Sequence, residues 1–320
     1  MPLFLRESDV EQLLTMENTV AVVEEVLRLQ GSGKADNRPR QRPMLERSML
    51  QAMPAGVQGI GFGLKAYTIG TKGVRFIVLL WHDETGDLEA VIEADKLGQM
   101  RTGAASGVAT KYLANPEAKT AGVFGSGWQA RSQLEAVCTV RPIEHAWVYS
   151  RRPAKREEFA EEMTDVLGIN VEATEEPDRV ASESEVIITI TNSSEPLFDG
   201  KLLKPGTHIN AAGSNRATAS EIDSETVKRS DLISIDDQAQ GRVEAGDLLG
   251  PIEEGIITWD DVVELGQIVA GEVQGRPTAD AITLFESLGI AIEDVAAARH
   301  IYDKAVQAGL GESLPGTILG

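Results

Sequence analysis

The spacing of hydrophobic and polar residues changes near Pro116, and this change separates two kinds of predicted structure. Before Pro116, residues 19–30 place their apolar side chains on one face of a helix that stops at Gly31. A shorter helix is expected ahead of it, because Ser8 and Glu11 have the spacing of a capping box. A polar stretch then leads from these helices into the next region.

Strands are predicted between Met44 and Ile92, where Val, Ile, Phe and Tyr are frequent and glycine-containing turns separate the apolar runs. A helix is expected after them, and Pro116 lies just beyond its end. The expected strands cover 59–68, 73–82 and 88–92, and the expected helix covers 94–114. The first part of the chain therefore predicts an α+β arrangement.

Beyond Pro116, short apolar strands alternate with helices, which predicts a parallel, doubly wound sheet of the Rossmann type. Strands are expected at 120–125, 146–149, 186–191, 208–212 and 232–235, and helices at 128–140 and 153–167. A final helical region is expected from Asp280 to Gln307. The predicted fold class is α/β.

A glycine-rich turn joins the first strand of this second part to its first helix, in the segment Gly125-Ser126-Gly127-Trp128-Gln129-Ala130. Gly125 allows a tight turn, Gly127 lets the backbone approach a pyrophosphate, and Ala130 is small enough for helix–strand packing. The pyrophosphate would lie at the start of the helix, where backbone N–H groups point outward. A turn without a ligand is the alternative, but the strand–turn–helix context favours a dinucleotide site.

The end of the next strand bears on the choice of cofactor. NAD enzymes place Asp or Glu there, whereas a basic residue accommodates the 2′-phosphate of NADP. This strand ends in Ser150-Arg151-Arg152, and guanidinium groups suit phosphate, so NADP is favoured over NAD. The alternative is that the arginines only begin a solvated helix. Thr191, at the end of a later strand, is expected near the nicotinamide, or else caps its strand.

Composition adds limits on partners and location. The 320 residues suit two domains, and 50 acidic against 30 basic residues give a net charge of −20, which argues against nucleic acid and anionic membranes. Only 11 basic residues are lysine, so the diffuse acidity suggests a halophilic protein, with an ordinary acidic cytoplasmic enzyme as the alternative.

The lone Cys138 fits the cytoplasm, and neither a signal peptide nor a membrane span is expected. No metal site is expected, because the four histidines lack ligand spacing.

Six short segments occur in one order along nearly the whole chain. They are Met53-Pro54-Ala55, Leu64-Lys65, Arg101-Thr102-Gly103-Ala104, the glycine turn, Lys204-Pro205-Gly206-Thr207-His208-Ile209-Asn210 and Ser287-Leu288-Gly289-Ile290-Ala291-Ile292-Glu293-Asp294. Together they resemble the ornithine cyclodeaminase/mu-crystallin family, which also holds an archaeal type of alanine dehydrogenase and several imino-acid reductases.

The resemblance implies a homodimer in which a dinucleotide domain is inserted into a substrate domain. Residues 1–116 with 291–320 would form the substrate-binding and dimerisation domain. Residues 117–290 would form the NAD(P)-binding Rossmann domain. The change of pattern near Pro116 agrees with the first of these boundaries, whereas the second rests mainly on the resemblance.

The resemblance also implies roles for individual residues. Arg40 and Arg101 resemble arginines that bind a substrate carboxylate, although Arg38 and Arg42 are alternatives for the first. Lys65 resembles the active-site lysine, and Thr102 and Leu288 would contact the cofactor. The chemistry is consistent, because a guanidinium binds a carboxylate in two places and a lysine buried beside arginines has a lowered pKa.

One departure from the family pattern bears on the reaction. Cyclodeaminases and alanine dehydrogenases have an Asp after the glycine of the 208–213 strand, where this sequence has Ser214-Asn215. Asn215 cannot take a proton, which favours NAD(P)-dependent reduction of a preformed imine or simple oxidative deamination of a small amino acid. Ornithine cyclodeaminase or alanine dehydrogenase activity is the alternative, and a non-enzymatic, mu-crystallin-like ligand-binding protein is a further one.

Overall fold

The computed structural model describes residues 1–71 and 73–315, which divide into two compact units. Unit 1 comprises Met1–Arg101 and Ile290–Gly320, and unit 2 comprises Thr102–Gly289. The first boundary lies inside helix α3 (Asp95–Leu113), earlier than the change of pattern at Pro116. The reason is that Pro116 follows the end of the helix, whereas the second half of α3 belongs to the interior of unit 2. Thr110 in that half, for example, accepts a hydrogen bond from Asn210 at 3.0 Å.

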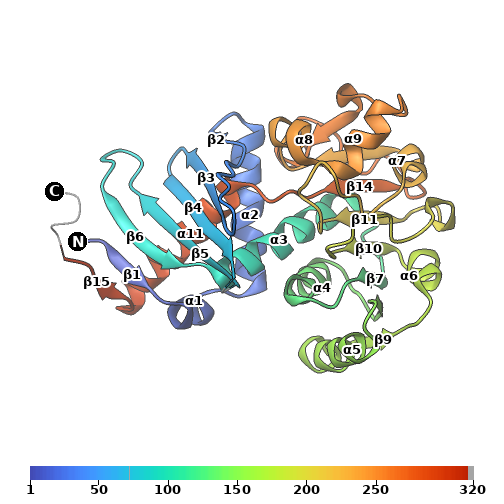
Figure 1. Ribbon diagram of the computed structural model, residues 1–320, viewed down its shortest axis with the longest axis horizontal. Coiled ribbons are helices and arrows are strands. Elements are labelled where there is room, and N and C mark those ends of the chain that lie inside the picture. The colour runs from blue at the N-terminus through green and yellow to red at the C-terminus, as the bar shows by residue number, and fades with distance from the viewer. Residues whose placement is uncertain (72, 316–320) are drawn as a thin grey trace. The chain divides into compact units, whose positions relative to one another are not determined.

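Unit 1 is built on a seven-stranded sheet in the order β15-β1-β6-β5-β4-β3-β2. Strands β3 to β6 form an antiparallel meander, and α11 packs against β3, β4 and α2 (Figure 1). The elements are β1 (Leu3–Leu5), α1 (Glu7–Leu13), α2 (Met16–Gly31), β2 (Ala35–Asn37), β3 (Met49–Val57), β4 (Gly61–Gly70), β5 (Gly73–Trp81), β6 (Leu88–Glu93), the start of α3, α11 (Ala291–Ala308) and β15 (Glu312–Ser313).

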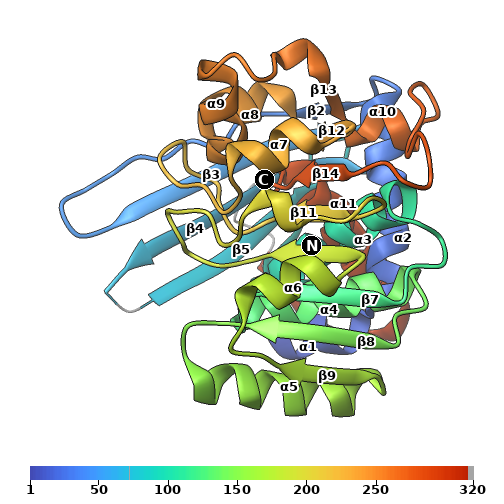
Figure 2. The same ribbon diagram turned by 90° about the vertical axis from the view of Figure 1, so that its right-hand side faces the viewer.

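Unit 2 contains an eight-stranded parallel sheet in the order β13-β12-β14-β11-β10-β7-β8-β9 (Figure 2). Its strands are β7 (Thr120–Phe124), β8 (His145–Tyr149), β9 (Asn170–Ala173), β10 (Val186–Thr189), β11 (His208–Ala211), β12 (Leu232–Ile235), β13 (Val262–Glu264) and β14 (Thr283–Glu286). Its helices are α4 (Trp128–Val140), α5 (Pro153–Leu167), α6 (Pro177–Glu183), α7 (Ser224–Arg229), α8 (Gln238–Glu244), α9 (Gly246–Glu253) and α10 (Leu265–Val269), with short 3-10 turns at Gly200–Leu202 and Trp259–Asp261.

The strand order of unit 2 reverses between β7 and β10. The chain passes outward from β7 through β8 to β9, and then returns to build β10 and β11 on the other side of β7. In open parallel sheets such a switch point leaves a crevice at the carboxyl ends of the strands, where ligands bind. The predicted α/β class with a Rossmann-type sheet is confirmed.

Two local predictions were wrong. Residues 280–307 were expected to be helical throughout, but Thr283–Glu286 form the buried strand β14, and α11 begins only at Ala291. A short apolar run has no clear period, and pairing with β11 and β12 decides its structure. The first helix begins at Glu7, and the Asp9 side chain accepts from the Arg6 backbone N–H at 2.9 Å, so Ser8 and Glu11 do not form the capping box.

None of the helices formed by residues 1–71 and 73–315 is both long and apolar enough to span a membrane.

Candidate functional site

Lys65 lies in the middle of β4, opposite Met53 of β3 and Val78 of β5. Its side chain is 3% exposed. Gly63 faces the same side of the strand, and a Cβ there would lie 2.4 Å from Val295 Cγ2 of α11. The missing side chain therefore allows the first turns of α11 to approach β4 beside Lys65.

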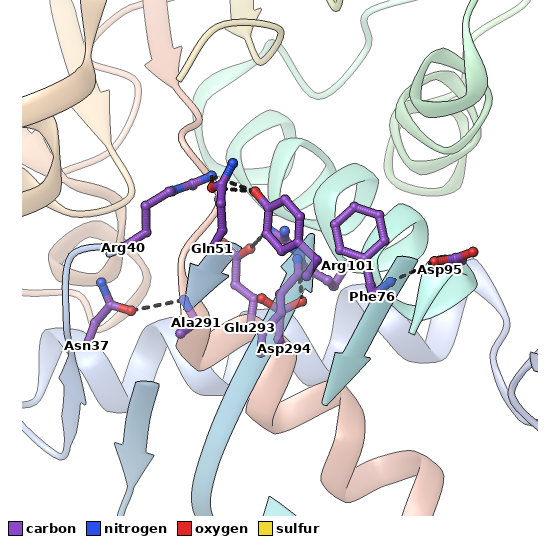
Figure 3. A network of polar contacts seen from close by, with 12 residues as sticks. Asn37, Arg40, Gln51, Phe76, Asp95, Arg101, Ala291, Glu293 and Asp294 are labelled. Atoms are coloured by element: carbon purple, nitrogen blue, oxygen red, sulfur yellow. Dashed lines mark hydrogen bonds and ion pairs between the residues drawn. The ribbon is translucent and has the colours of Figure 1, made fainter. Parts of the chain in front are cut away.

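Two acidic residues at the start of α11 meet two cations in unit 1 (Figure 3). Lys65 Nζ lies 3.0 Å from Asp294 Oδ1, and Arg101 Nε lies 3.0 Å from the same oxygen. Arg101 Nη1 donates to Glu293 Oε2 at 2.8 Å. All four side chains are buried. Together with Arg40 they are called the charged cluster below.

Arg40 donates hydrogen bonds to two neutral side chains of the sheet. Its Nη1 donates to Gln51 Oε1 at 3.4 Å and to the Tyr67 hydroxyl at 3.3 Å, and that hydroxyl donates to Gln51 Oε1 at 2.6 Å (Figure 3). Arg40 is buried, whereas Arg38 is exposed and paired with an acidic neighbour, and Arg42 is half-buried. Of the three arginines considered as the first carboxylate-binding residue, Arg40 is thus the buried one. Its contact with Tyr67 places it beside β4, the strand that carries Lys65.

Burial moves the pKa values of two groups in this cluster toward neutral pH. Burial and the positive charge of Arg101 lower the pKa of Lys65 to about 8, against the opposing effect of Asp294. Burial raises the pKa of Glu293 to about 7, against the attraction of Arg101. Burial also acts to lower the pKa of Arg101, but Asp294 and Glu293 outweigh it and raise that pKa, so the guanidinium stays charged.

Glu293 and Asp294 were not among the site residues expected from the sequence. They adjoin aliphatic residues on both sides, in Ile290-Ala291-Ile292 before them and Val295-Ala296-Ala297 after them. Two adjacent acids among the apolar residues at the start of a helix predict buried carboxylates with cationic partners, because an unpaired buried charge is too costly. This signal was present but does not say which cations are the partners.

The charged cluster contains two buried guanidinium groups, those of Arg40 and Arg101. A guanidinium group is well suited to bind a ligand carboxylate in two places. Among the residues that the structure describes, no group of three His, Cys, Asp or Glu side chains is arranged to hold a metal ion.

The glycine turn of unit 2 has the geometry of a dinucleotide-binding turn. Gly125 follows β7 with a φ of 120°, and a Cβ there would lie 2.3 Å from the Ile190 carbonyl oxygen, so a side chain is excluded. A Cβ on Gly127 would have nothing within 4 Å, so the start of α4 is open at this residue. Trp128 and Gln129 form the first turn of α4, and Trp128 is exposed.

The end of β8 lies beside this turn. Ser126 Oγ donates to Ser150 Oγ at 2.9 Å, which links the turn after β7 to the residue after β8. Arg151 and Arg152 are exposed, and Arg152 directly precedes the start of α5. Arg156 is buried instead, and donates to the Ser150 carbonyl at 3.1 Å and to Glu175 at 2.8 Å. The arginines available to a ligand at this edge are therefore Arg151 and Arg152.

The other expected cofactor contacts occupy separate parts of unit 2. Thr191 follows β10, and its backbone N–H and its hydroxyl both donate to Glu221. The backbone N–H of Leu288 donates to Asp236 at 2.8 Å. The Thr102 carbonyl accepts from Gln133 Nε2 at 3.1 Å. Thr191 thus lies at the carboxyl end of the strand that borders the switch point, and Glu221 fixes its position.

Asn215 lies in unit 2, in the irregular segment that follows β11. Lys65, Arg40 and Arg101 all lie in unit 1. The four residues expected to act on the substrate are therefore not contained in one compact unit, and the structure brings together the three cations.

The sequence model of the ornithine cyclodeaminase/mu-crystallin family matches residues 1–309. The chain belongs to this family. A Delta(1)-pyrroline-2-carboxylate reductase of Bacillus cereus is 38% identical over 278 residues, which cover 84% of this chain and 85% of that protein. These matches confirm the family expected from the six segments.

Solved structures from the family have the same fold. Thermococcus litoralis Delta(1)-pyrroline-2-carboxylate reductase, in complex with NADH and L-proline, has a TM-score of 0.93 and 38% sequence identity, and the match covers 98% of this chain and 100% of that one. An archaeal alanine dehydrogenase dimer with bound NAD has a TM-score of 0.92 and 32% identity, and the match covers 98% of this chain and 99% of that one. The expected class, a nicotinamide-dependent enzyme acting at a carbon–nitrogen bond, is thus confirmed at the level of the family.

Proposed function

We propose that this protein reduces a small cyclic or linear α-imino acid, such as a pyrroline or piperideine carboxylate, with a nicotinamide cofactor, or catalyses the reverse reaction. The observation that carries the proposal is the charged cluster, in which the buried Lys65 lies near two buried arginines and one acidic pair. An α-imino acid offers one carboxylate and one nitrogen that must be protonated. The cluster provides groups for both.

In this proposal, Arg40 and Arg101 bind the substrate carboxylate. The bidentate geometry of guanidinium matches that carboxylate and orients the substrate. Lys65 donates its proton to the imine nitrogen, which makes the C=N carbon electrophilic. A lysine with a pKa of about 8 is protonated at neutral pH and still gives up its proton readily.

Unit 2 binds the cofactor in this account. The residues that would hold it are the glycine turn Gly125, Ser126 and Gly127, the start of α4 at Trp128 and Gln129, and the flanking residues Thr102, Thr191 and Leu288. When bound, the nicotinamide supplies or accepts the hydride. Asn215 would take part only as a hydrogen-bonding group, because an amide cannot act as a base.

NADP is the proposed cofactor, in preference to NAD. The support is local, since Tyr149-Ser150-Arg151-Arg152 contains no carboxylate, Ser150 contacts the turn, and Arg151 and Arg152 are exposed. Two relatives have NADH or NAD in their structures. Comparing kcat/KM for NADPH and NADH tests the choice, and a preference for NADH that Arg151→Gln and Arg152→Gln leave unchanged would overturn it.

The protein is proposed to act as a homodimer through unit 1. The sheet face opposite α11 presents exposed Leu50, Phe62 and Ile77, and a cavity of about 790 Å³ lies there, lined in part by Phe62, Leu64 and Trp81. An exposed apolar patch of this kind marks an interface.

Sedimentation velocity is expected to give about twice the 34.4 kDa of one chain. Phe62→Glu should shift the protein to a monomer, whereas Val166→Glu, at an exposed apolar position of unit 2, should not.

We also propose that the protein works in a salt-rich cytoplasm. The net charge of −20 repels itself at low ionic strength, and salt screens that repulsion. The single Cys138 is half-buried and burial raises its pKa to about 12, which suits an inert packing residue.

The experiment that tests the function is a spectrophotometric assay in concentrated KCl. NADPH and NADH are tested with pyrroline and piperideine carboxylates, and the oxidised cofactors with proline, alanine and ornithine. Consumption of reduced cofactor with an imino acid supports the proposal. Activity with alanine or ornithine alone would assign the protein to the dehydrogenase or cyclodeaminase branch. Cofactor binding without any turnover would favour a ligand-binding role.

A further inference from the structure

The two acidic residues of the charged cluster make different contacts. Asp294 Oδ1 lies 3.0 Å from both Lys65 Nζ and Arg101 Nε. Glu293 Oε2 accepts from Arg101 Nη1 at 2.8 Å, and Glu293 Oε1 has no hydrogen-bond partner within 1–71 and 73–315. Glu293 is fully buried, so this oxygen has lost its water without replacement. Asp294 thus links two cations, whereas Glu293 acts on Arg101.

We propose that Glu293 is a positioning residue whose ionised carboxylate holds Arg101 in the orientation that binds the substrate carboxylate, and that protonation of Glu293 weakens this hold. The inference rests on the proposed function, because it takes Arg101 as a ligand of the substrate. It goes further by identifying the group that controls binding as the pH falls.

The geometry of Arg101 supports this role. Glu293 and Asp294 accept from two different donors of one guanidinium, Nη1 and Nε. Because the guanidinium is planar, two such contacts fix both its plane and the directions of its remaining N–H groups. If Glu293 gains a proton, a charge-assisted hydrogen bond becomes a weaker neutral one, and Asp294 alone cannot fix the plane. The proton comes from solvent and forms an O–H bond on Glu293, with no change of oxidation state.

Charged groups from several elements act on Glu293. Arg101 of α3 and Lys65 of β4 favour its ionised form, and Asp294, its neighbour on α11, opposes it. Tyr67 of β4 acts on Arg101, and Arg40, which precedes β3, acts on Lys65. Burial is the largest influence and raises the pKa of Glu293 to about 7, so the carboxylate changes charge in the range where the enzyme would work.

The proposal predicts a specific split in the kinetics. The value of kcat/KM reports groups of the free enzyme, so it should fall about tenfold for each pH unit below about 7. The value of kcat should fall much less, because the bound substrate carboxylate itself holds Arg101. The effect of acid is therefore expected in KM. The fall of kcat/KM at acid pH is called the acid limb of the profile. Replacing a residue with a purely structural role would lower protein stability but would leave this acid limb in place.

The test compares the pH profile of imino-acid reduction in four proteins. Glu293→Gln preserves shape but cannot titrate, so its kcat/KM should change less than about twofold between about pH 5.5 and about pH 7. Glu293→Asp keeps a titrating carboxyl and should restore an acid limb. Glu89→Gln, at the carboxylate that pairs with Arg299 elsewhere in unit 1, is the matched control and should keep the wild-type profile. An unchanged acid limb in Glu293→Gln would overturn the proposal.

Infrared spectroscopy separates a failure of this inference from a failure of the proposed function. As the pH falls from about 8 to about 6, the wild type should gain the infrared band of a protonated carboxylic acid. Glu89→Gln should gain the same band, and Glu293→Gln should lack it. No turnover with any imino acid would refute the proposed function. Absence of a Glu293-dependent band in this range would refute the inference, whatever the enzyme reduces.

Discussion

At the residue scale, the charged cluster depends on the opposite effects that burial has on acids and bases. Burial disfavours the charged form of each group, so it lowers the pKa of a lysine and raises that of a carboxylic acid. The pKa of Lys65 falls from 10.5 to about 8, and that of Glu293 rises from 4.5 to about 7. The two values approach each other near neutral pH, where proton transfer to and from a substrate is easiest.

Replacing Lys65 tests its role as the proton donor. Lys65→Met is expected to lower kcat for imino-acid reduction by about 100- to 10,000-fold, since a positioned proton donor contributes roughly that factor. NADPH affinity, measured by fluorescence titration, should not change, because the glycine turn belongs to unit 2. In the wild type, reduction should decline above about pH 8 as Lys65 loses its proton. Lys155→Met, at an exposed lysine, is the control, and a Lys65→Met enzyme with near-normal kcat would rule out this mechanism.

Glu286 offers a second test, on protein stability. It is fully buried at the end of β14, and neither carboxylate oxygen has a hydrogen-bond partner in the part of the chain that the structure describes. Burial raises its pKa well above 4.5, with further repulsion from Asp247 and Asp236. The folded state therefore binds the proton more tightly than the unfolded state does. Its stabilising effect is complete below about pH 4.5 and is lost as the pH rises toward the folded-state pKa.

Glu286→Gln removes this pH dependence. Between about pH 5 and about pH 8, the free energy of unfolding of the wild type should fall relative to the variant by up to about 1.4 kcal/mol per pH unit. Urea denaturation at several pH values measures the difference. Glu161→Gln, at an exposed position on α5, should show no such trend. A constant difference between wild type and Glu286→Gln would mean that Glu286 does not retain a proton in the folded state.

At the scale of elements, the turn between β7 and α4 contains two glycines with different functions. Gly125 is required by the backbone, since its φ is positive and the Ile190 carbonyl leaves no space. Gly127 is required only if a ligand approaches, because its φ of −84° suits any residue and its surroundings are open. The two substitutions should therefore have different effects.

Gly125→Ala is expected to lower the melting temperature by several degrees and to abolish cofactor binding. Gly127→Ala should leave the melting temperature within about one degree of the wild type while weakening NADPH binding at least tenfold, because the added methyl group meets the pyrophosphate. Calorimetry and fluorescence titration give the two quantities. Unchanged NADPH affinity in Gly127→Ala would show that the dinucleotide binds elsewhere.

Much of the element pattern could be predicted from local sequence. The strands β7, β8, β10, β11 and β12 and the helices α4 and α5 were predicted from apolar runs, and their positions agree with the structure to within a few residues. The short strands β9 and β13 were not predicted. The strand β14 could not be predicted, because Thr283–Glu286 is too short to show a period and adjoins a long helix. Its position between β11 and β12 is decided by contacts distant in sequence.

At the scale of the whole molecule, the acidic charge predicts a dependence on salt. Raising KCl from about 0.1 M to about 1 M shortens the Debye length from about 10 Å to about 3 Å, which removes most repulsion between surface carboxylates. The melting temperature should therefore rise by several degrees over this range. Sodium perchlorate at equal ionic strength is the control. It screens charge to the same extent, so a difference between the two salts reports effects of the ion type. A melting temperature that falls with KCl would contradict the halophilic interpretation.

The candidate site could be predicted in part. Lys65 and Arg101 were expected from short segments that resemble the family, and the glycine turn from its strand–turn–helix context. Glu293 and Asp294 were not expected, because their partners lie on β4 and α3, far away in the sequence. Local patterns identify a buried acid, but only the tertiary structure shows which cation it meets.

The most direct test of the central claim follows the hydride to its destination. The protein is incubated in KCl with Delta(1)-pyrroline-2-carboxylate and nicotinamide cofactor deuterated at C4, and the product is analysed by mass spectrometry and NMR. The account predicts proline with one deuterium at Cα, formed by the wild type at least about 100-fold faster than by Lys65→Met. Cofactor that binds but leaves the imino acid unreduced, or proline without deuterium at Cα, would contradict it.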